Sequence, residues 1–356
     1  MNVSAPPPVA SPRGLVRKPI DDIGRVRIYF DGRVPLSEYL DKCRLLEREI
    51  TEGPASRWSV RGLVTDMPTD TELRERLGAG GPIEVNRLPV RIAGREQEYL
   101  WVSRNSPDRL PDADARQRFA DRIAACGQFQ DQVAPNFADH TRQLLDRARA
   151  AGLSLVCNDP FEEWGTDQVD ADTFARLIGE LFYVGPESAR LMTRGRGYST
   201  SWHYLFGLRD RAGELLAVFV LAKWPWGFEA TYTMMNRAYA GDAVGAGGAN
   251  LLMLLSSALL LSRHGTDTLV YGEANAANCR PCVQAGYRIV PLDLGGTDPL
   301  VHRNVVWADN PIGAPDTSAE APHHSIAEYI SYVLMRLDTR AVAPFTDQAL
   351  DFLAVR

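Results

Sequence analysis

A run of thirteen mostly apolar residues, Ala249–Leu261, stands in the C-terminal half of the sequence. A helix that spans a bilayer needs about 20 apolar residues, so this run is too short to cross a membrane. It predicts instead a buried helix over 250–263. Strand patterns flank this helix at Phe228–Met235 and Thr268–Gly272, and a glycine-rich loop over 240–249 precedes it. Together these elements predict an α/β unit.

The size and charge of the chain narrow the class of protein. At about 100–200 residues per domain, 356 residues predict two domains. The net charge of −6 excludes the basic surface that nucleic acid or an anionic membrane would need. Five cysteines in so long a chain do not indicate a secreted disulfide framework, and the N-terminus lacks a signal-peptide pattern. We expect a cytoplasmic protein that binds neither nucleic acid nor membrane.

The order of helix and strand patterns suggests two units in tandem. A helix, a glycine and an apolar strand succeed one another at 144–159 and again at 255–275, which favours two copies of one α/β unit. A terminal helix is expected over Ile326–Leu337. The predicted divisions are a disordered arm at 1–19, a first domain at 20–165, a catalytic domain at 166–307, a linker at 308–323 and a helical extension at 324–356.

The loop before the apolar helix carries four glycines, Gly241, Gly245, Gly247 and Gly248. Glycines let a backbone approach a phosphate closely, and a helix N-terminus supplies N–H donors and a positive dipole. The pattern favours a cofactor with a pyrophosphate. The Gly-Lys-Ser/Thr of a P-loop is absent, and a dinucleotide fingerprint fits only in that Glu273 ends the next strand. A plain flexible loop is the alternative interpretation.

The residues after the apolar helix add to this pattern. Asn275 ends a strand, and Gly286-Tyr287 closes a short helix eleven residues further on. With Gly245 and Gly247, this succession resembles the Gcn5-related N-acetyltransferase (GNAT) superfamily, in which the loop holds the pyrophosphate of an acyl-CoA. The resemblance implies an α/β (α+β) fold with two GNAT-like mixed-sheet domains in tandem, the N-terminal one degenerate.

The resemblance also implies a cofactor site without a metal. Acyl-CoA would be the acyl donor, and a backbone N–H on the strand Thr231–Met235 would stabilise the oxyanion, because this strand splays from its neighbour in the family. Asp242 departs from the Gln or Arg of the family loop. The residues expected to contact the cofactor are Met234, Met235, Gly245, Ala246, Gly247, Gly248, Asn275 and Asn278.

Three residues are candidates for the catalytic chemistry. His203 is the first candidate for the base, because its pKa lies near working pH and we expect its strand at the edge of a hairpin that faces the cleft. A structural histidine in an aromatic strand is the alternative. Glu273 is the second candidate, since strand-end carboxylates in the family hold a catalytic water. Cys282 stands where many members have a tyrosine that protonates the departing thiolate, a role that water could also fill.

Cysteines and tryptophans invite two further interpretations. Cys279 and Cys282 form a C-x-x-C pair, but the thioredoxin-like interpretation fails because Gly286 ends the helix four residues later. Trp224-Pro-Trp226-Gly predicts an exposed bend. We expect three tryptophans to bind substrate or line a path for an acyl chain: Trp202, Trp224 and Trp226.

These patterns predict an acyl-CoA-dependent N-acyltransferase that acts on a primary amine by direct attack in a ternary complex. The size and the two units resemble the N-acyltransferases that fatty-acylate the aminosugar of teicoplanin-class glycopeptide antibiotics. That resemblance implies a medium or long acyl chain, a glycopeptide aminosugar as acceptor and a role in antibiotic biosynthesis. A small-amine or aminoglycoside acetyltransferase, a non-catalytic acyl-CoA-binding protein and a nicotinamide oxidoreductase are the alternatives.

Overall fold

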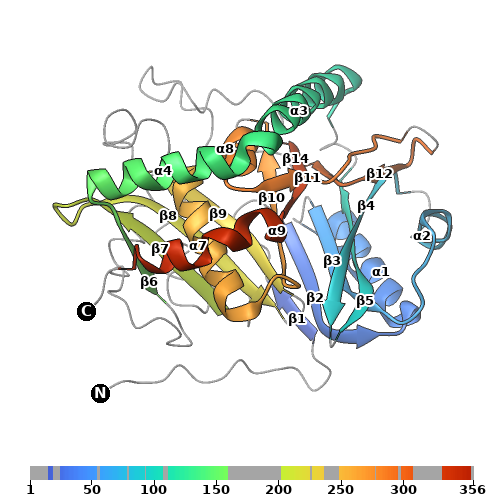
Figure 1. Ribbon diagram of the computed structural model, residues 1–356. Coiled ribbons are helices and arrows are strands. Elements are labelled where there is room, and N and C mark those ends of the chain that lie inside the picture. Colours follow the sequence, from blue (N-terminus) through green and yellow to red (C-terminus); the bar gives the residue numbers. More distant parts are fainter. Residues whose placement is uncertain are drawn as a thin grey trace.

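Two β-sheets pack against each other, with helices on the outer face of each sheet (Figure 1). This arrangement confirms the predicted α/β class with two mixed sheets. The computed structural model describes residues 15–18, 25–53, 57–77, 80–92, 94–106, 111–158, 202–224, 227–235, 248–276, 278–295, 298–307 and 331–353. Residues 15–18 of the expected arm form a strand; the rest of that arm and the expected linker at 308–323 lie outside the described residues.

The N-terminal sheet has the strand order β1-β2-β3-β5-β4-β12. Its elements are β1 (Leu15–Lys18), β2 (Arg25–Val34), α1 (Leu36–Glu52), β3 (Arg57–Val64), α2 (Asp70–Leu77), β4 (Ile83–Ile92), β5 (Arg95–Asn105) and β12 (Val301–Arg303). Helix α1 connects the parallel strands β2 and β3. It covers the outer face because its apolar residues, from Tyr39 to Ile50, recur at helical spacing.

The C-terminal sheet has the order β11-β14-β10-β9-β8-β7-β6, with β13 paired to β14. Its strands are β6 (Ser154–Asn158), β7 (Trp202–Arg209), β8 (Leu215–Trp224), β9 (Gly227–Met235), β10 (Leu269–Asn275), β11 (Tyr287–Ile289), β13 (Val305–Trp307) and β14 (Ser331–Leu337). Its helices are α3 (Ala113–Val133), α4 (Phe137–Ala151), α7 (Gly248–His264), α8 (Cys279–Gln284), α9 (Thr339–Val342) and α10 (Thr346–Leu350), with 3₁₀ turns at Ala134–Asn136 and Ala343–Phe345.

Helix α7 is the apolar helix that the sequence predicts. Every residue from Leu251 to Leu261 is buried. The outer face of the C-terminal sheet covers one side of α7, and α8, α9 and α10 cover others. A helix enclosed on all sides needs no polar stripe, which explains its unbroken apolar character. No helix in the described ranges is long and apolar enough to cross a membrane.

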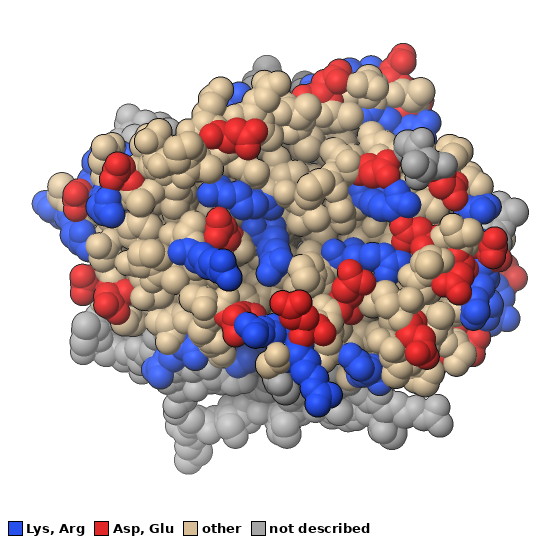
Figure 2. All heavy atoms as spheres, turned by 45° about the vertical axis from the view of Figure 1, so that its right-hand side comes forward, with Lys and Arg blue, Asp and Glu red and all other residues tan. Residues whose placement is uncertain are grey.

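The inner faces of the two sheets pack on each other. Tyr29 of β2 stacks on Trp224 of β8, with ring centroids 4.4 Å apart, and Tyr99 of β5 lies beside Tyr271 of β10. Strand β3 is buried along its whole length, and β8 is buried at every residue except the half-buried Lys223, since helices cover one face and the opposite sheet covers the other. The molecule therefore has four layers: helix, sheet, sheet and helix. On the visible surface, basic and acidic side chains are interspersed (Figure 2).

The helix predicted over Ile326–Leu337 is wrong for residues 331–337, and residues 326–330 lie outside the described residues. Residues 331–337 form β14, which pairs antiparallel with both β10 and β11. Val333, Leu334 and Met335 are all buried, because β14 is covered on both faces. A strand buried on both faces reads as a nearly continuous apolar run, and periodicity does not distinguish such a run from a buried helix.

The sheets exchange segments of chain across the predicted domain divisions. β6 pairs with β7 in the C-terminal sheet, and α3 and α4 pack on that sheet. β12 pairs in parallel with β4 of the N-terminal sheet. The strands of the two similar segments, β6 and β10, both belong to the C-terminal sheet.

Candidate functional site

Strands β9 and β10 part from each other halfway along their length. Their parallel ladder runs from Gly227 opposite Leu269 to Ala230 opposite Gly272. Beyond this point β9 continues to Met235, and β10 continues to Asn275, without pairing to each other within the described residues. The sheet therefore opens between the two strands toward their C-terminal ends.

A β-bulge explains why β9 leaves its neighbour. Leu221 of β8 lies opposite Ala230, but Val220 lies opposite Tyr232, so Thr231 is an extra residue in β9. Such a bulge bends a strand and increases its twist. β10 meanwhile stays paired with β14 as far as Asn275. The splay that the GNAT resemblance implies is thus present, and the backbone of β9 beyond the bulge faces the opening.

Several of the expected cofactor residues lie around this opening. Met234 and Met235 end β9, Gly248 begins α7, and Asn275 ends β10. The carboxyl ends of parallel strands are where α/β sheets bind ligands. Gly245, Ala246, Gly247, Asp242 and Trp226 lie outside the described residues, as do the side chains of Met234 and Met235.

Asn275 and Asn278 form the turn between β10 and α8. The Asn275 Oδ1 accepts a hydrogen bond from the Asn278 backbone N–H at 2.9 Å, and the Asn275 carbonyl accepts from the same N–H at 3.1 Å. The turn begins a short helix, as the sequence predicts, and Gly286 follows it with a φ of +93°. The Asn275 side chain therefore stabilises the turn between β10 and α8.

His203 does not lie at the edge of the opening. It is paired with Ala222 of β8, and β8 separates β7 from β9. The register places His203 level with Glu229, before the point where β9 and β10 part. The expected position of His203 at the edge of the opening is therefore wrong, because β8, and not β7, is the hairpin strand that pairs with β9. The side chains of His203 and Trp202 lie outside the described residues, so their roles stay predictions.

Trp224 is part of the packing between the sheets. It is 5% exposed, stacks on Tyr29, and donates a hydrogen bond from Nε1 to Glu229 Oε2 at 3.0 Å. The expectation of an exposed bend is wrong for this residue, because the N-terminal sheet covers the end of β8.

Cys282 and Cys279 are thiols on the short helix α8. Burial, together with the nearby Cys126, raises the pKa of the Cys282 thiol to about 12. Cys279 is buried against Cys126 of α3, and its Sγ lies 3.9 Å from Met335 Sδ. A thiol with so high a pKa stays protonated at neutral pH and gives up its proton reluctantly.

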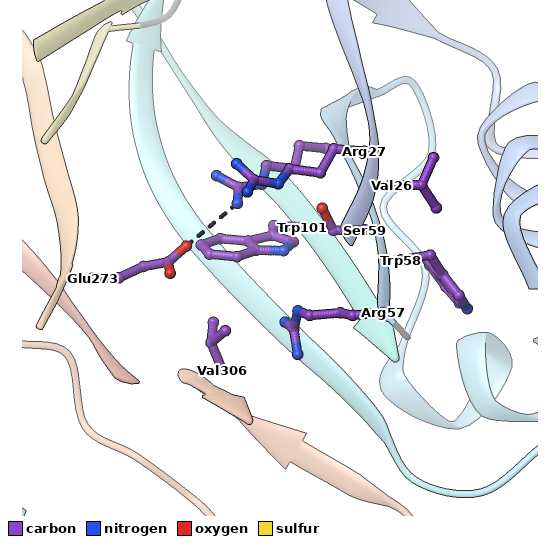
Figure 3. Close-up of a pocket in the computed structure, with 9 residues that line it drawn as sticks. Val26, Arg27, Arg57, Trp58, Ser59, Trp101, Glu273 and Val306 are labelled. Atoms are coloured by element: carbon purple, nitrogen blue, oxygen red, sulfur yellow. Dashed lines mark hydrogen bonds and ion pairs between the residues drawn. The ribbon is translucent and has the colours of Figure 1, made fainter. Parts of the chain in front are cut away.

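A buried charge cluster joins the two sheets next to the opening. The Arg61 guanidinium of β3 lies 2.7 Å from Glu229 of β9 and 3.3 Å from Glu273 of β10. Glu229 precedes the last β9–β10 pair and Glu273 follows it. Arg61 also lies over the Trp101 ring, 3.5 Å from its centroid. Two carboxylates beside the parting strands are thus held by one arginine from the other sheet. Figure 3 shows Glu273, one of these carboxylates.

The groups around Arg61 stabilise its positive charge. Burial by itself would lower the pKa of the guanidinium, but Glu229, together with Tyr29 and Glu273, outweighs this effect and raises the pKa well above its ordinary value. Arg61 is therefore a permanent cation in a buried place. Glu229 accepts further hydrogen bonds from Trp224 and, at 3.4 Å, from the Tyr271 hydroxyl.

A small cavity of about 10 Å³, with room for about one water molecule, lies beside Glu273 and is mostly lined by the N-terminal sheet (Figure 3). Arg57, Ser59, Arg61 and Trp101 line it from β3 and β5. Sequence reasoning missed these residues. The alternation of polar and apolar residues in β3 was a signal, but it usually indicates a face in contact with water. Only the second sheet turns this polar face into a buried site.

No protein-family model matches the sequence, and a search of curated proteins finds no similar protein. A solved chimera of the Vibrio cholerae spermidine N-acetyltransferase SpeG and hSSAT aligns at 10% identity, over 53% of this chain and 97% of that chain, with a TM-score of 0.35. A Bacillus subtilis acetyltransferase in complex with CoA aligns at 14% identity, over 52% and 98%, with a TM-score of 0.32. A Streptococcus pneumoniae acetyltransferase of the GNAT family aligns at 12% identity, over 52% and 98%, with a TM-score of 0.29. Likenesses at such low TM-scores do not assign this chain to a family.

Proposed function

We propose that the protein is an acyl-CoA-dependent N-acyltransferase that transfers an acyl group to a small-molecule primary amine. The opening between β9 and β10 carries this proposal. Beyond Ala230, the β9 backbone does not pair with β10 within the described residues, and a pair of carboxylates lies beside it. Since His264 at the end of α7 contacts Phe228 at the start of β9, α7 begins near the opposite, C-terminal end of β9. A thioester in the opening would place its carbonyl oxygen near the β9 backbone.

The reaction is direct attack in a ternary complex. The amine nitrogen forms a bond to the thioester carbon, a backbone N–H of β9 beyond Thr231 stabilises the oxyanion, and the carbon–sulfur bond then breaks. A base takes the proton from the amine, and the departing thiolate takes a proton from a donor. The Cys282 thiol, which stays protonated at neutral pH, and water are the two candidates for that donor.

Glu273 is the stronger candidate for the base. It is the first residue of β10 after the last β9–β10 pair, whereas His203 lies on a strand separated from β9 by β8. We expect Glu273→Gln to lower kcat about 100-fold or more, because the amide cannot accept the proton of the amine. His203→Gln would leave kcat within about threefold. The exposed Glu214 of the β7–β8 turn offers a matched control, Glu214→Gln. The reverse result for Glu273 and His203 would assign the base to the histidine.

Acyl-CoA binding tests the proposal itself. Titration of the purified chain with acetyl-, octanoyl- and decanoyl-CoA by calorimetry should give micromolar binding. Through the resemblance in size, the proposal includes a medium or long acyl donor, a glycopeptide aminosugar as acceptor and a role in antibiotic biosynthesis. A medium or long acyl donor requires that the binding free energy of the acyl-CoA becomes more favourable with chain length, by up to ~0.8 kcal/mol per buried CH₂. Equal binding of the three would favour a small-amine acetyltransferase, and no binding of any would refute the proposed function.

A further inference from the structure

The N-terminal sheet stays closed between its own parallel strands, but one of its side chains reaches the opening of the C-terminal sheet. Strands β2 and β3 are parallel and are connected by α1, as β9 and β10 are by α7. Beyond a register shift they pair again as far as Val34 opposite Val64, where both strands end. Arg61, on the inner face of β3, bonds to residues of both β9 and β10.

Arg61 holds its two carboxylates in different ways. Both oxygens of Glu229 have donors, since Oε1 accepts a hydrogen bond from Arg61. Its Oε2 accepts from Trp224 and Tyr271. Glu273 accepts from Arg61 at Oε1, and its Oε2 has no donor among the described residues. In Figure 3 the dashed line ends on one of the two Glu273 oxygens. The Glu273 side chain is 19% exposed, against 9% for Glu229. Of the two carboxylates, Glu273 is thus the one with an oxygen left for a proton.

The charges of this cluster leave Glu273 able to act. The nitrogens of Arg61 lie 2.7 Å from Glu229 and 3.3 Å from Glu273. One arginine between two ionised carboxylates leaves one negative charge over. Because Glu229 is nearer, it offsets most of the charge of the arginine, and Arg61 can orient Glu273 without cancelling its charge. A guanidinium suits this task, since its N–H groups form a rigid fork that reaches two acceptors at once.

Arg61 is placed to act on Glu273 and not on a substrate. Its side chain is 4% exposed and lies over the Trp101 ring, 3.5 Å from the centroid. The cavity beside it has room for about one water molecule. Three donors without partners among the described residues line this cavity: Ser59 Oγ, Arg61 Nε and Trp101 Nε1. A water molecule can bond to such donors, but a substrate does not fit there.

From these contacts we infer that Arg61 is a positioning residue, which fixes Oε1 of Glu273 and so keeps Oε2 available to the amine at the opening between β9 and β10. The inference rests on the proposed function, because it takes Glu273 as the base. Oε2 accepts the proton of the amine as the nitrogen–carbon bond forms, and Arg61 itself transfers no proton. The N-terminal sheet then sets the rate of a reaction that takes place on the C-terminal sheet.

The test is Arg61→Lys in the full chain. Lysine keeps the positive charge but lacks the fork, so we expect it to stay with the nearer Glu229 and to release Glu273. The assay follows release of the CoA thiol from acetyl- and octanoyl-CoA with D-glucosamine, kanamycin and cadaverine as amines. We expect kcat to fall about tenfold or more, while the Kd of the acyl-CoA stays within about twofold. A merely structural role would lower the stability of the chain and leave kcat of the folded protein unchanged.

Arg104→Lys is the matched control. Arg104 of β5 has a side chain that is 1% exposed, and it lies 2.7 Å from Glu47 of α1, on the outer face of the same sheet. The same substitution there should lower the denaturation midpoint to a similar extent and leave kcat within about twofold. If Arg61→Lys does not fold, the double variant Arg61→Met with Glu229→Gln takes its place. It leaves no isolated charge at residue 229 and should show the same loss of kcat.

Two results would overturn the inference. One is a folded Arg61→Lys protein whose kcat stays within about twofold of that of the unchanged chain. The other is an equal loss of kcat in Arg104→Lys, because the loss would then follow destabilisation in general. Failure of the proposed function looks different. An unchanged chain that neither binds acyl-CoA nor releases its thiol would refute both proposals, whereas turnover that does not depend on Arg61 would refute the inference alone.

Discussion

The two faces of the C-terminal sheet are equally buried, but they are built from different chemistry. On the outer face, the leucines of α7 belong to the same apolar core as the strands, and Ser257 pairs with the Tyr287 hydroxyl at 3.1 Å. On the inner face, Glu229 and Glu273 meet Arg61 from the other sheet, beside donors that lack partners among the described residues.

This difference separates the residues that stabilise the fold from those proposed to carry the function. Burying apolar surface stabilises a protein by about 25 cal/mol per Å², whereas burying a charge is unfavourable unless a partner compensates it. An inner face built only for stability would be apolar, as the outer face is. The charges lie where β9 and β10 part, which is where the proposed chemistry needs them.

The buried ion pair should respond most strongly to substitution. Arg61→Met leaves Glu229 buried without its cation, and we expect a loss of about 4 kcal/mol in the free energy of unfolding. Guanidinium denaturation measures this loss. The double variant Arg61→Met with Glu229→Gln should recover part of it, since no isolated charge then remains. A loss below about 1 kcal/mol in the single variant would show that the pair is hydrated.

A substitution on the apolar outer face should lower the free energy of unfolding slightly less than Arg61→Met does. Leu259 is fully buried in α7, and Leu259→Ala removes apolar contacts and leaves a cavity, so we expect a loss of about 3 kcal/mol. Urea unfolding provides the measurement. Because this face carries no proposed chemistry, acyl-CoA affinity of the folded variant should stay within about twofold. A large change in affinity would contradict the separation of the two faces.

A backbone position tests the close approach of β9 to β10. Gly227 has a φ of +151°, and a Cβ there would lie 2.2 Å from the Leu269 carbonyl oxygen. We expect Gly227→Ala to cost about 2 kcal/mol through strain and displacement. Gly213 in the β7–β8 turn also has a positive φ, but open space surrounds it. Gly213→Ala is the matched control and should cost only about 1 kcal/mol, as thermal unfolding would show.

His302 should make stability depend on pH. Burial lowers its pKa below 6.5, and its Nδ1 accepts a hydrogen bond from Trp307 Nε1 at 2.7 Å, which requires the neutral ring. Below pH 6.5 the unfolded chain binds the proton first, so stability is lost as pH falls through the lowered pKa. Unfolding midpoints between pH 7 and 5 should show the loss. His302→Gln should make the unfolding midpoint depend less steeply on pH, and His140→Gln on the exposed side of α4 should not.

The smallest effect should come from a charge pair on the rim between the sheets. Arg91 of β4 lies 3.1 Å from Asp267, and both side chains are well exposed. Exposed pairs contribute about 0.2–1 kcal/mol, and salt screens them. Arg91→Ala should therefore change the unfolding free energy by about 0.5 kcal/mol at low salt and less at high salt. An effect comparable to that of Arg61→Met would mean that burial does not set the strength of these pairs.

Local patterns predicted the elements whose surroundings are simple. The turn Asp210–Gly213 and its flanking strands form the expected hairpin, and the apolar run forms α7. The same reasoning failed at β14, where burial on both faces hides the period of a strand. It also misplaced His203, because a hairpin pattern does not say which of its strands joins the rest of the sheet.

The sequence by itself determined the α/β class, α7 with its flanking strands and the candidate carboxylate Glu273, since these depend on contacts near in sequence. Only the tertiary structure decided that Glu273 meets Arg61, 212 residues away in sequence, and that Trp224 is buried. The physical reason is that residues with alternating polar side chains are equally suited to water and to a second sheet. The choice between these two environments is made by packing between distant segments.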